Sequence, residues 1–243
     1  MTIFWDFLTL FVLILMMFLF RRKPTAASFF AALAIGLAAV GGFFLSDLVK
    51  GPLETRVVAP LAEKAAANDL ADMFSKAHLA TGRETAASLP LEDLLRQRPE
   101  AFTQLLAHYG ADITAVENGY ENAGHDRVAV LTAITGRFAA AIARAIAYAA
   151  LFILLFVVLI LIGRRIQSGM PPPRRRKRKL RLSSVLIGLA AGILLIWAVG
   201  AMFDMALPVL GTDIPGFSEE IFRATRLYSI LHMINPLTYL YTS

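Results

Sequence analysis

The chain has 243 residues, of which 57% belong to the hydrophobic set and only 17% are charged. Soluble domains carry about 25% charged residues, so this composition favours a membrane protein over a soluble one. The absence of cysteine from the sequence excludes disulfides, thiolate metal sites and a cysteine nucleophile. The net charge of +6 would suggest a nucleic-acid partner only if it were spread over a soluble surface, so its position along the chain decides its meaning.

Four apolar stretches predict four transmembrane helices, at residues 3–20, 26–46, 145–163 and 183–203. At a rise of about 1.5 Å per residue, a helix needs roughly 20 residues to cross a hydrocarbon core, and each stretch is long enough to span. A signal peptide has its basic residues before the apolar run, whereas the first stretch here has them after it. We therefore expect a retained anchor.

The basic residues predict the orientation of these helices. Residues 21–25 hold three basic and no acidic residues, and residues 164–182 hold nine basic and none acidic. The long segment 49–138 holds nine basic against twelve acidic residues, and the tail from Asp204 holds two against four. By the positive-inside rule, the first two segments are cytoplasmic, and the long segment and both chain termini are extracytoplasmic.

The same basic side chains admit two interpretations, because clusters of lysine and arginine attract anionic lipid and nucleic acid through the same Coulomb interaction. No aromatic stacking residue interrupts the longer run and no nucleic-acid-binding module surrounds it. We therefore expect the anionic inner leaflet of a bilayer as partner, and no nucleic acid. The residues expected to fix topology on this lipid surface are Arg21, Arg22, Lys23, Arg174, Arg175, Arg176, Lys177, Arg178 and Lys179.

The long extracytoplasmic segment is patterned for short helices. Pro99 stands where a first-turn proline is tolerated and Gly110 follows as a stop, which predicts one amphipathic helix. A second helix is expected just after Ser88, and a third at Pro60, entered from the second membrane helix through PLETRVVAP. From Asp126, an expected N-cap, the apolar pattern continues without a breaker into the third membrane helix.

The sequence thus predicts an all-α integral membrane protein in four parts. Residues 1–48 form the first two transmembrane helices, and residues 49–138 form a small extracytoplasmic helical insert. Residues 139–205 form the other two transmembrane helices, joined by the basic cytoplasmic loop 164–182, and residues 206–243 form an extracytoplasmic tail.

Charged side chains in membrane segments are costly and often functional. Measured along each helix from its basic end, Asp6 is expected inside the bilayer, whereas Asp47, Arg144 and Asp204 come near the outer interface. One hypothesis makes Asp6 and Arg144 a polar membrane core, in which Asp6 pairs with Arg144 or with serine or tyrosine donors, or relays a proton. The other places all four groups beside interfacial water.

Small residues one helical turn apart predict close helix packing. Gly188 and Gly192 form a GxxxG pair in the fourth apolar stretch, and Ala34, Ala38 and Gly42 have the same spacing in the second. Such residues let backbones approach, which matters in lipid because the hydrophobic effect does not drive helices together there. The partner of the GxxxG pair is either the second helix or another copy of the chain.

The sequence predicts no catalytic, cofactor-binding or metal-binding residue. Its four histidines show no ligand spacing and are expected to be surface residues: His78, His108, His125 and His232. A membrane enzyme using outer carboxylates would need the following residues to share one pocket: Asp112, Glu117, His125 and Asp126.

These features resemble the colicin V production protein (CvpA) family of small bacterial inner-membrane proteins. Trp5 and Asp6 open the first helix as in the family's apolar-Asp-apolar start, and a basic pair follows at 21–22. The second helix is Ala/Gly-rich as in the family, and the segment LSSVLIGLAAGILLIW (182–197) is similar to the family's small-residue fourth helix. The tail RLYSILHMINPL (226–237) resembles the Ser then Asn-Pro ending of longer members. The family's glycines around the first basic loop are replaced here by RRKPTAAS, and the external insert is long.

The resemblance implies a four-helix protein of the bacterial plasma membrane that supports colicin V production, a toxin biosynthetic process, together with envelope maintenance and secretion. Asp6, Gly188 and Gly192 are the positions it carries over, as packing or polar-core residues. We expect a non-catalytic scaffold or secretion accessory whose partner is an unidentified envelope protein, or a second copy of the chain in a homo-oligomer. The alternative is a small-solute or ion transporter or channel subunit, which would need a polar stripe through the bundle.

Overall fold

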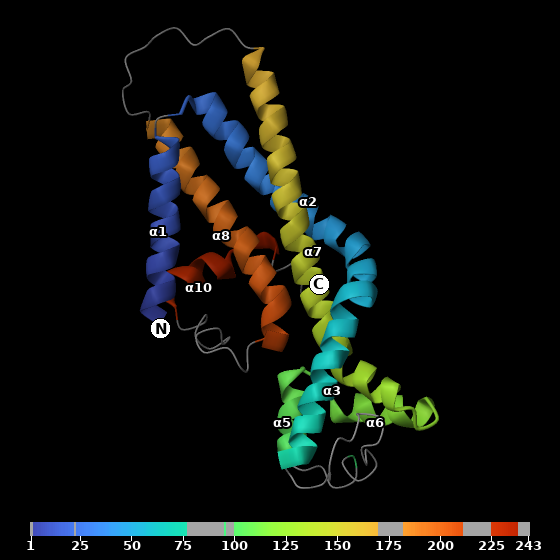
Figure 1. Cartoon of the computed structure of the whole chain (residues 1–243). Helices are drawn as coiled ribbons and strands as arrows, with labels where there is room; N and C mark the ends of the chain where they lie inside the picture. Colours follow the sequence, from blue (N-terminus) through green and yellow to red (C-terminus); the bar gives the residue numbers. More distant parts are fainter. Residues whose placement is uncertain are drawn as a thin grey trace. The chain divides into compact units, whose positions relative to one another are not determined.

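The computed structural model of the chain describes residues 2–21, 23–76, 95, 100–169, 182–210 and 225–237. This described part is all-helical and contains no strand, so the expected all-α class is confirmed for it. The helices, drawn in Figure 1, are α1 (Thr2–Phe20), α2 (Thr25–Leu53), the π-helix η1 (Glu54–Val58), α3 (Ala59–Lys76), α5 (Glu100–His108), α6 (Ile113–Asn122), α7 (Arg127–Ser168), α8 (Leu182–Leu210) and α10 (Arg226–Met233).

Three helical segments are long and apolar enough to cross a membrane, by length and composition: Thr25–Met73, Val128–Ser168 and Leu182–Ala206. The first helix is apolar over Phe4–Phe20 but shorter. Three such helices fit a multi-pass membrane protein.

The chain divides into two compact units, which are described separately. Unit 1 draws on residues 1–48, 145–205 and 216–243, and unit 2 on residues 49–144 and 206–215, each over its described residues.

In unit 1, α8 runs antiparallel to α1 and approaches its backbone closely (Figure 1). A Cβ added at Gly188 would lie 2.8 Å from the carbonyl oxygen of Met16, and one at Gly192 would lie 3.1 Å from a methyl carbon of Leu13. Such distances leave no room for a side chain at Gly188. The neighbour of the GxxxG pair within the chain is therefore α1, not the second helix that we had considered.

The small residues of α2 lie against α7 and α8. At Gly42, an added Cβ would lie 3.2 Å from the backbone nitrogen of Phe152, so α2 and α7 touch backbone to backbone there. Ala34 and Ala38 are both buried. Farther along the bundle, the hydroxyl groups of Thr25 and Ser183 lie 3.3 Å apart, which ties the start of α2 to the start of α8.

Unit 2 has an apolar core of its own, built from α3, α5, α6 and the first part of α7. Two side-chain hydrogen bonds cross it: Tyr109 donates to Asp69 at 2.6 Å, and Thr132 donates to Glu63 at 2.9 Å. Burial and the Asp69 carboxylate raise the pKa of the Tyr109 hydroxyl above its ordinary value. The buried core residues are Ala66, Leu70, Phe102, Leu106, Tyr109, Val116, Tyr120, Val130 and Ile134.

The predicted helix ends of unit 2 are confirmed where the structure describes them. Gly110, at φ 62°, ends α5, and the amide of Ala111 bonds back to the carbonyl of Leu106 at 2.8 Å, as in a Schellman motif. At the start of α7, the Asp126 carboxylate accepts a hydrogen bond from the amide of Val128. The helix expected after Ser88 lies outside the described residues except for Leu95, which is helical and packs against the core of unit 2.

The helix expected at Pro60 is present as α3, and the segment PLETRVVAP that leads into it is itself helical, because α2, η1 and α3 follow one another directly. A proline inside a helix lacks the N–H donor and crowds the carbonyl four residues earlier, which for Pro60 is Arg56, within η1. The wider π turn accommodates this crowding while the helix continues, and its Val58 packs on Ala139 and Ala143 of α7.

We predict that Gly188→Ala destabilises unit 1 by about 1–3 kcal/mol, because the added methyl group would overlap the α1 backbone. The matched control is Gly36→Ala, where the Cβ would meet only a leucine side chain of α8, at 3.6 Å. Thermal unfolding in detergent, followed by tryptophan fluorescence, is the measurement. Both tryptophans of the chain, Trp5 and Trp197, belong to unit 1. Equal melting temperatures for the two variants would contradict close packing at Gly188.

Candidate functional site

A group of polar side chains lies where α10 packs on α1 and α8 (Figure 1). We refer to it as the α10 cluster. It consists of Asp6, Trp197, Asp204, Tyr228, His232 and Asn235.

The carboxylate of Asp6 caps the N-terminus of α10. Its Oδ1 accepts hydrogen bonds from the amides of Leu227 at 2.8 Å and Tyr228 at 3.4 Å, and its Oδ2 accepts one from Arg226 at 3.2 Å. The first amides of a helix have no partner within it, and the positive end of the helix dipole favours a negative charge. Thr225, in the usual capping position, makes no side-chain cap bond. The cap therefore comes from the other end of the chain.

Trp197 and Asn235 fasten the end of α10 to α8. The indole Nε1 of Trp197 donates to the carbonyl of Leu231 at 2.8 Å, and the amide nitrogen of Asn235 donates to the carbonyl of Trp197 at 3.2 Å. The side-chain oxygen of Asn235 accepts from the amide of Leu237 at 3.1 Å. Asn235 is fully buried, so these bonds offset the desolvation of its amide group.

His232 and Tyr228 occupy one face of α10 and turn it toward α8. Their rings are stacked, with centroids 5.7 Å apart, and Nε2 of His232 lies 3.6 Å from a carboxylate oxygen of Asp204. Gly200 of α8 makes space for these rings, because a Cβ there would lie 3.2 Å from the Tyr228 hydroxyl oxygen. Burial, and secondarily the negative charge of Asp204, raise the pKa of the Tyr228 hydroxyl above its ordinary value.

The structure gives Asp6 backbone partners in place of the serine or tyrosine donors that we had considered. Asp6 belongs to unit 1, and Arg144 is half-buried on α7 in unit 2. Asp47 is exposed on α2. Asp204 is half-buried and faces His232.

Two of the predicted lipid-surface residues are held by aromatic rings. The guanidinium carbon of Arg21 lies 4.4 Å from the centroid of the Phe18 ring, and the ammonium of Lys23 lies 4.8 Å from that of Phe20. Arg22 and the basic residues 174–179 lie outside the described residues.

Three members of the α10 cluster, Trp197, Tyr228 and Asn235, were not singled out from the sequence. His232 was expected on the surface, but its side chain is only 32% exposed, and its Nδ1 is buried without a hydrogen-bond partner among the described residues. The available signal was the spacing in the tail: Tyr228 and His232 are four residues apart, on one face of a helix, with Leu231 beside them.

In unit 2, two of the carboxylates that an enzyme site would need serve as helix caps. Asp112 accepts from the amide of Thr114 at 3.0 Å, and Asp126 accepts from that of Val128 at 3.0 Å. His125 stacks on Tyr120, with centroids 4.8 Å apart. In the part of the chain that the structure describes, no three His, Asp or Glu side chains are grouped to hold a metal ion.

Comparisons with protein-family models, with curated proteins and with solved structures find no match to this chain. The structure itself defines an all-helical chain with three helices long and apolar enough to cross a membrane, over the residues that it describes.

We predict that Asp6→Ala loosens α10, because the variant removes the acceptors of three amides. The expected loss is about 1–3 kcal/mol for hydrogen bonds to a charged cap. Asp6→Asn keeps one carbonyl oxygen as an acceptor, so the stability of α10 in this variant should lie between that in Asp6→Ala and that in the native chain. Hydrogen exchange of residues 226–233 in detergent measures the effect, and Asp47→Ala, an exposed carboxylate in the same unit, is the control. Unchanged exchange in Asp6→Ala would show that the cap does not hold α10.

Proposed function

We propose that the chain is a CvpA-like multi-pass protein of the bacterial plasma membrane and acts as a non-catalytic scaffold for envelope maintenance, secretion or toxin production. In this proposal four helices span the bilayer, with both termini and unit 2 on the extracytoplasmic side. Unit 2 is the part that binds an envelope protein. The basic segments lie on the cytoplasmic leaflet.

The side chains around α1 support its place as the fourth span. Its apolar stretch, Phe4–Phe20, is about 26 Å long at 1.5 Å per residue, near the short end of the range for a membrane helix. Large apolar side chains of α1 remain exposed in unit 1. Their exposure to water would be unfavourable, whereas lipid would cover them. They include Phe4, Phe7, Leu10, Phe11, Ile14, Phe18 and Leu19.

The observation that carries the scaffold proposal is the separate core of unit 2. Three helices and the first part of α7 enclose nine buried residues, and polar side chains such as Thr103, Gln104 and Asn118 are exposed on its surface beside the apolar Leu61 and Val128. The carboxylates Asp112 and Asp126 are used as helix caps, which stabilises the fold. A small folded unit on a membrane anchor offers a surface for a protein partner.

The transporter alternative is less well supported because of what Asp6 does. A proton or ion relay needs an acidic group whose oxygens are open to water or substrate. Both oxygens of Asp6 accept backbone hydrogen bonds from α10. Flux through proteoliposomes of the purified chain would nevertheless favour the transporter, if Asp6→Asn abolished it while α10 remained protected from hydrogen exchange.

We predict that a membrane-impermeant maleimide labels Thr103→Cys in intact cells and labels Ser168→Cys only after permeabilisation. Both positions are exposed, one on α5 and the other at the end of α7. The native chain has no cysteine, so the assay has no background from the protein itself. The reverse pattern would invert the topology and overturn the proposed function.

We also predict that a photo-crosslinking amino acid at Thr103 or Asn118 captures one defined envelope protein in cells. Both residues are exposed on unit 2, one on α5 and the other on α6. The matched control is position Leu154, an exposed apolar residue of α7 that should face lipid. Adducts are identified by mass spectrometry. Equal, diffuse products from all three positions would contradict a docking role for unit 2.

A further inference from the structure

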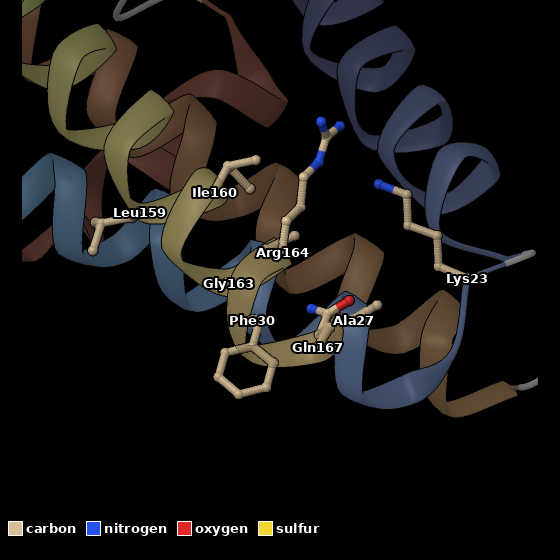
Figure 2. Close-up of a pocket in the computed structure, with 9 residues that line it drawn as sticks. Lys23, Ala27, Phe30, Leu159, Ile160, Gly163, Arg164 and Gln167 are labelled. Carbon is tan, nitrogen blue, oxygen red and sulfur yellow. The ribbon is translucent and has the colours of Figure 1, made fainter. Parts of the chain in front are cut away.

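At the end of unit 1 opposite the α10 cluster, a groove lies between the start of α2 and the end of α7. Its volume is about 210 Å³. Lys23, Arg164 and Gln167 supply its polar lining, and Phe30, Leu159 and Ile160 supply apolar lining. Figure 2 shows the Lys23 side chain, from the turn between α1 and α2, and the Arg164 side chain, from α7, extending into the same space.

The two cations of the groove have no acidic partner in the part of the chain that the structure describes. Neither Lys23 nor Arg164 forms an ion pair with a carboxylate among these residues, and residues 21–31 and 159–182 contain no Asp or Glu in the sequence. The ammonium of Lys23 instead lies over the Phe20 ring, which limits its freedom without neutralising its charge. Two neighbouring cations without a counter-charge favour an anion between them.

The surroundings of the groove select among anions. The two helices that line it also carry exposed apolar side chains close in sequence to the lining residues: Phe29 and Leu33 on α2 are 57% and 43% exposed, and Leu161 and Ile162 on α7 are 57% and 49% exposed. The groove is smaller than the pockets of about 300–1,000 Å³ that enclose drug-sized ligands, so it fits a headgroup but not whole acyl chains. A ligand with an anionic head and long apolar tails matches both the basic groove and the exposed apolar side chains of α2 and α7.

We propose that this groove binds the headgroup of an anionic phospholipid. The guanidinium of Arg164 binds the phosphate through paired hydrogen bonds, and the ammonium of Lys23 adds a second positive charge. The amide of Gln167 donates to an ester or glycerol oxygen, and the acyl chains lie on the exposed apolar faces of α2 and α7. The inference rests on the membrane placement of the proposed function, and it replaces a diffuse lipid surface with one defined site.

The test uses the full-length chain purified in an uncharged detergent. Phosphatidylglycerol and phosphatidylcholine with the same acyl chains are titrated separately, and bound lipid is counted by native mass spectrometry. We expect one phosphatidylglycerol to bind with higher affinity than phosphatidylcholine. At about 1 kcal/mol per charge, Lys23→Gln and Arg164→Gln should each weaken binding about fivefold, and the double variant about thirtyfold.

The matched control is Arg165→Gln, which removes an exposed charge from the same turn of α7 but not from the groove lining. Lys23 and Arg164 are exposed, so tryptophan fluorescence should report unchanged folding in every variant. An equal loss of phosphatidylglycerol affinity in the Arg165→Gln control would show non-specific electrostatic attraction and would overturn the proposed site. Glycerol phosphate competing at concentrations similar to phosphatidylglycerol would assign the groove to a soluble phosphate and overturn the lipid proposal. The scaffold proposal survives either result, because maleimide labelling and crosslinking test it independently.

Discussion

The hydrogen bonds of Asp6 join the two ends of the chain within unit 1. Its partners, Arg226 and Leu227, are 220 and 221 residues away in the sequence. An eight-residue helix such as α10 is not stable alone, because forming its first turn fixes many dihedral angles for a single hydrogen bond. The cap from Asp6 at one end and the bonds of Trp197 and Asn235 at the other hold α10 in place. The last described helix is thus a part of the bundle.

Asp6 can reach α10 only if α1 lies close to α8, and the glycines of α8 provide this. In lipid, helices gain no hydrophobic free energy by meeting, so contact depends on close backbone approach and on hydrogen bonds between helices. Gly188 and Gly192 allow the close backbone approach near one end of α1. Asp6 supplies the hydrogen bonds near the other end. Next to Asp6 in the sequence, the Trp5 ring of α1 contacts the Phe203 ring of α8, with centroids 6.1 Å apart. The position of α1 is therefore fixed along its length even though much of its surface is exposed.

The features that the sequence predicted well are local. An apolar run, a glycine stop at Gly110 and an N-cap at Asp126 each depend on a few neighbouring residues, so they can be read without the fold. The α10 cluster could not be predicted in this way, because backbone amides have no sequence signature. The carboxylate that binds them also comes from the opposite end of the chain. The continuity of α2 through η1 was missed for a related reason: Pro60 signals a break locally, whereas Val58 packs on α7 and holds the helix together.

The ends of unit 1 differ in charge, and in the proposed orientation this difference would connect topology with lipid binding. Asp6 and Asp204 lie at the end that carries α10, together with the basic Arg226, while Arg21, Lys23 and Arg164 lie at the other. If an anionic headgroup occupies the groove, its attraction to Lys23 and Arg164 is available only when that end faces an anionic leaflet. Inverting the protein would lose this interaction and would also bring the two carboxylates to the negative surface. The same pair of cations would then orient the chain and bind a lipid, because both effects need positive charges that no carboxylate of the described residues neutralises.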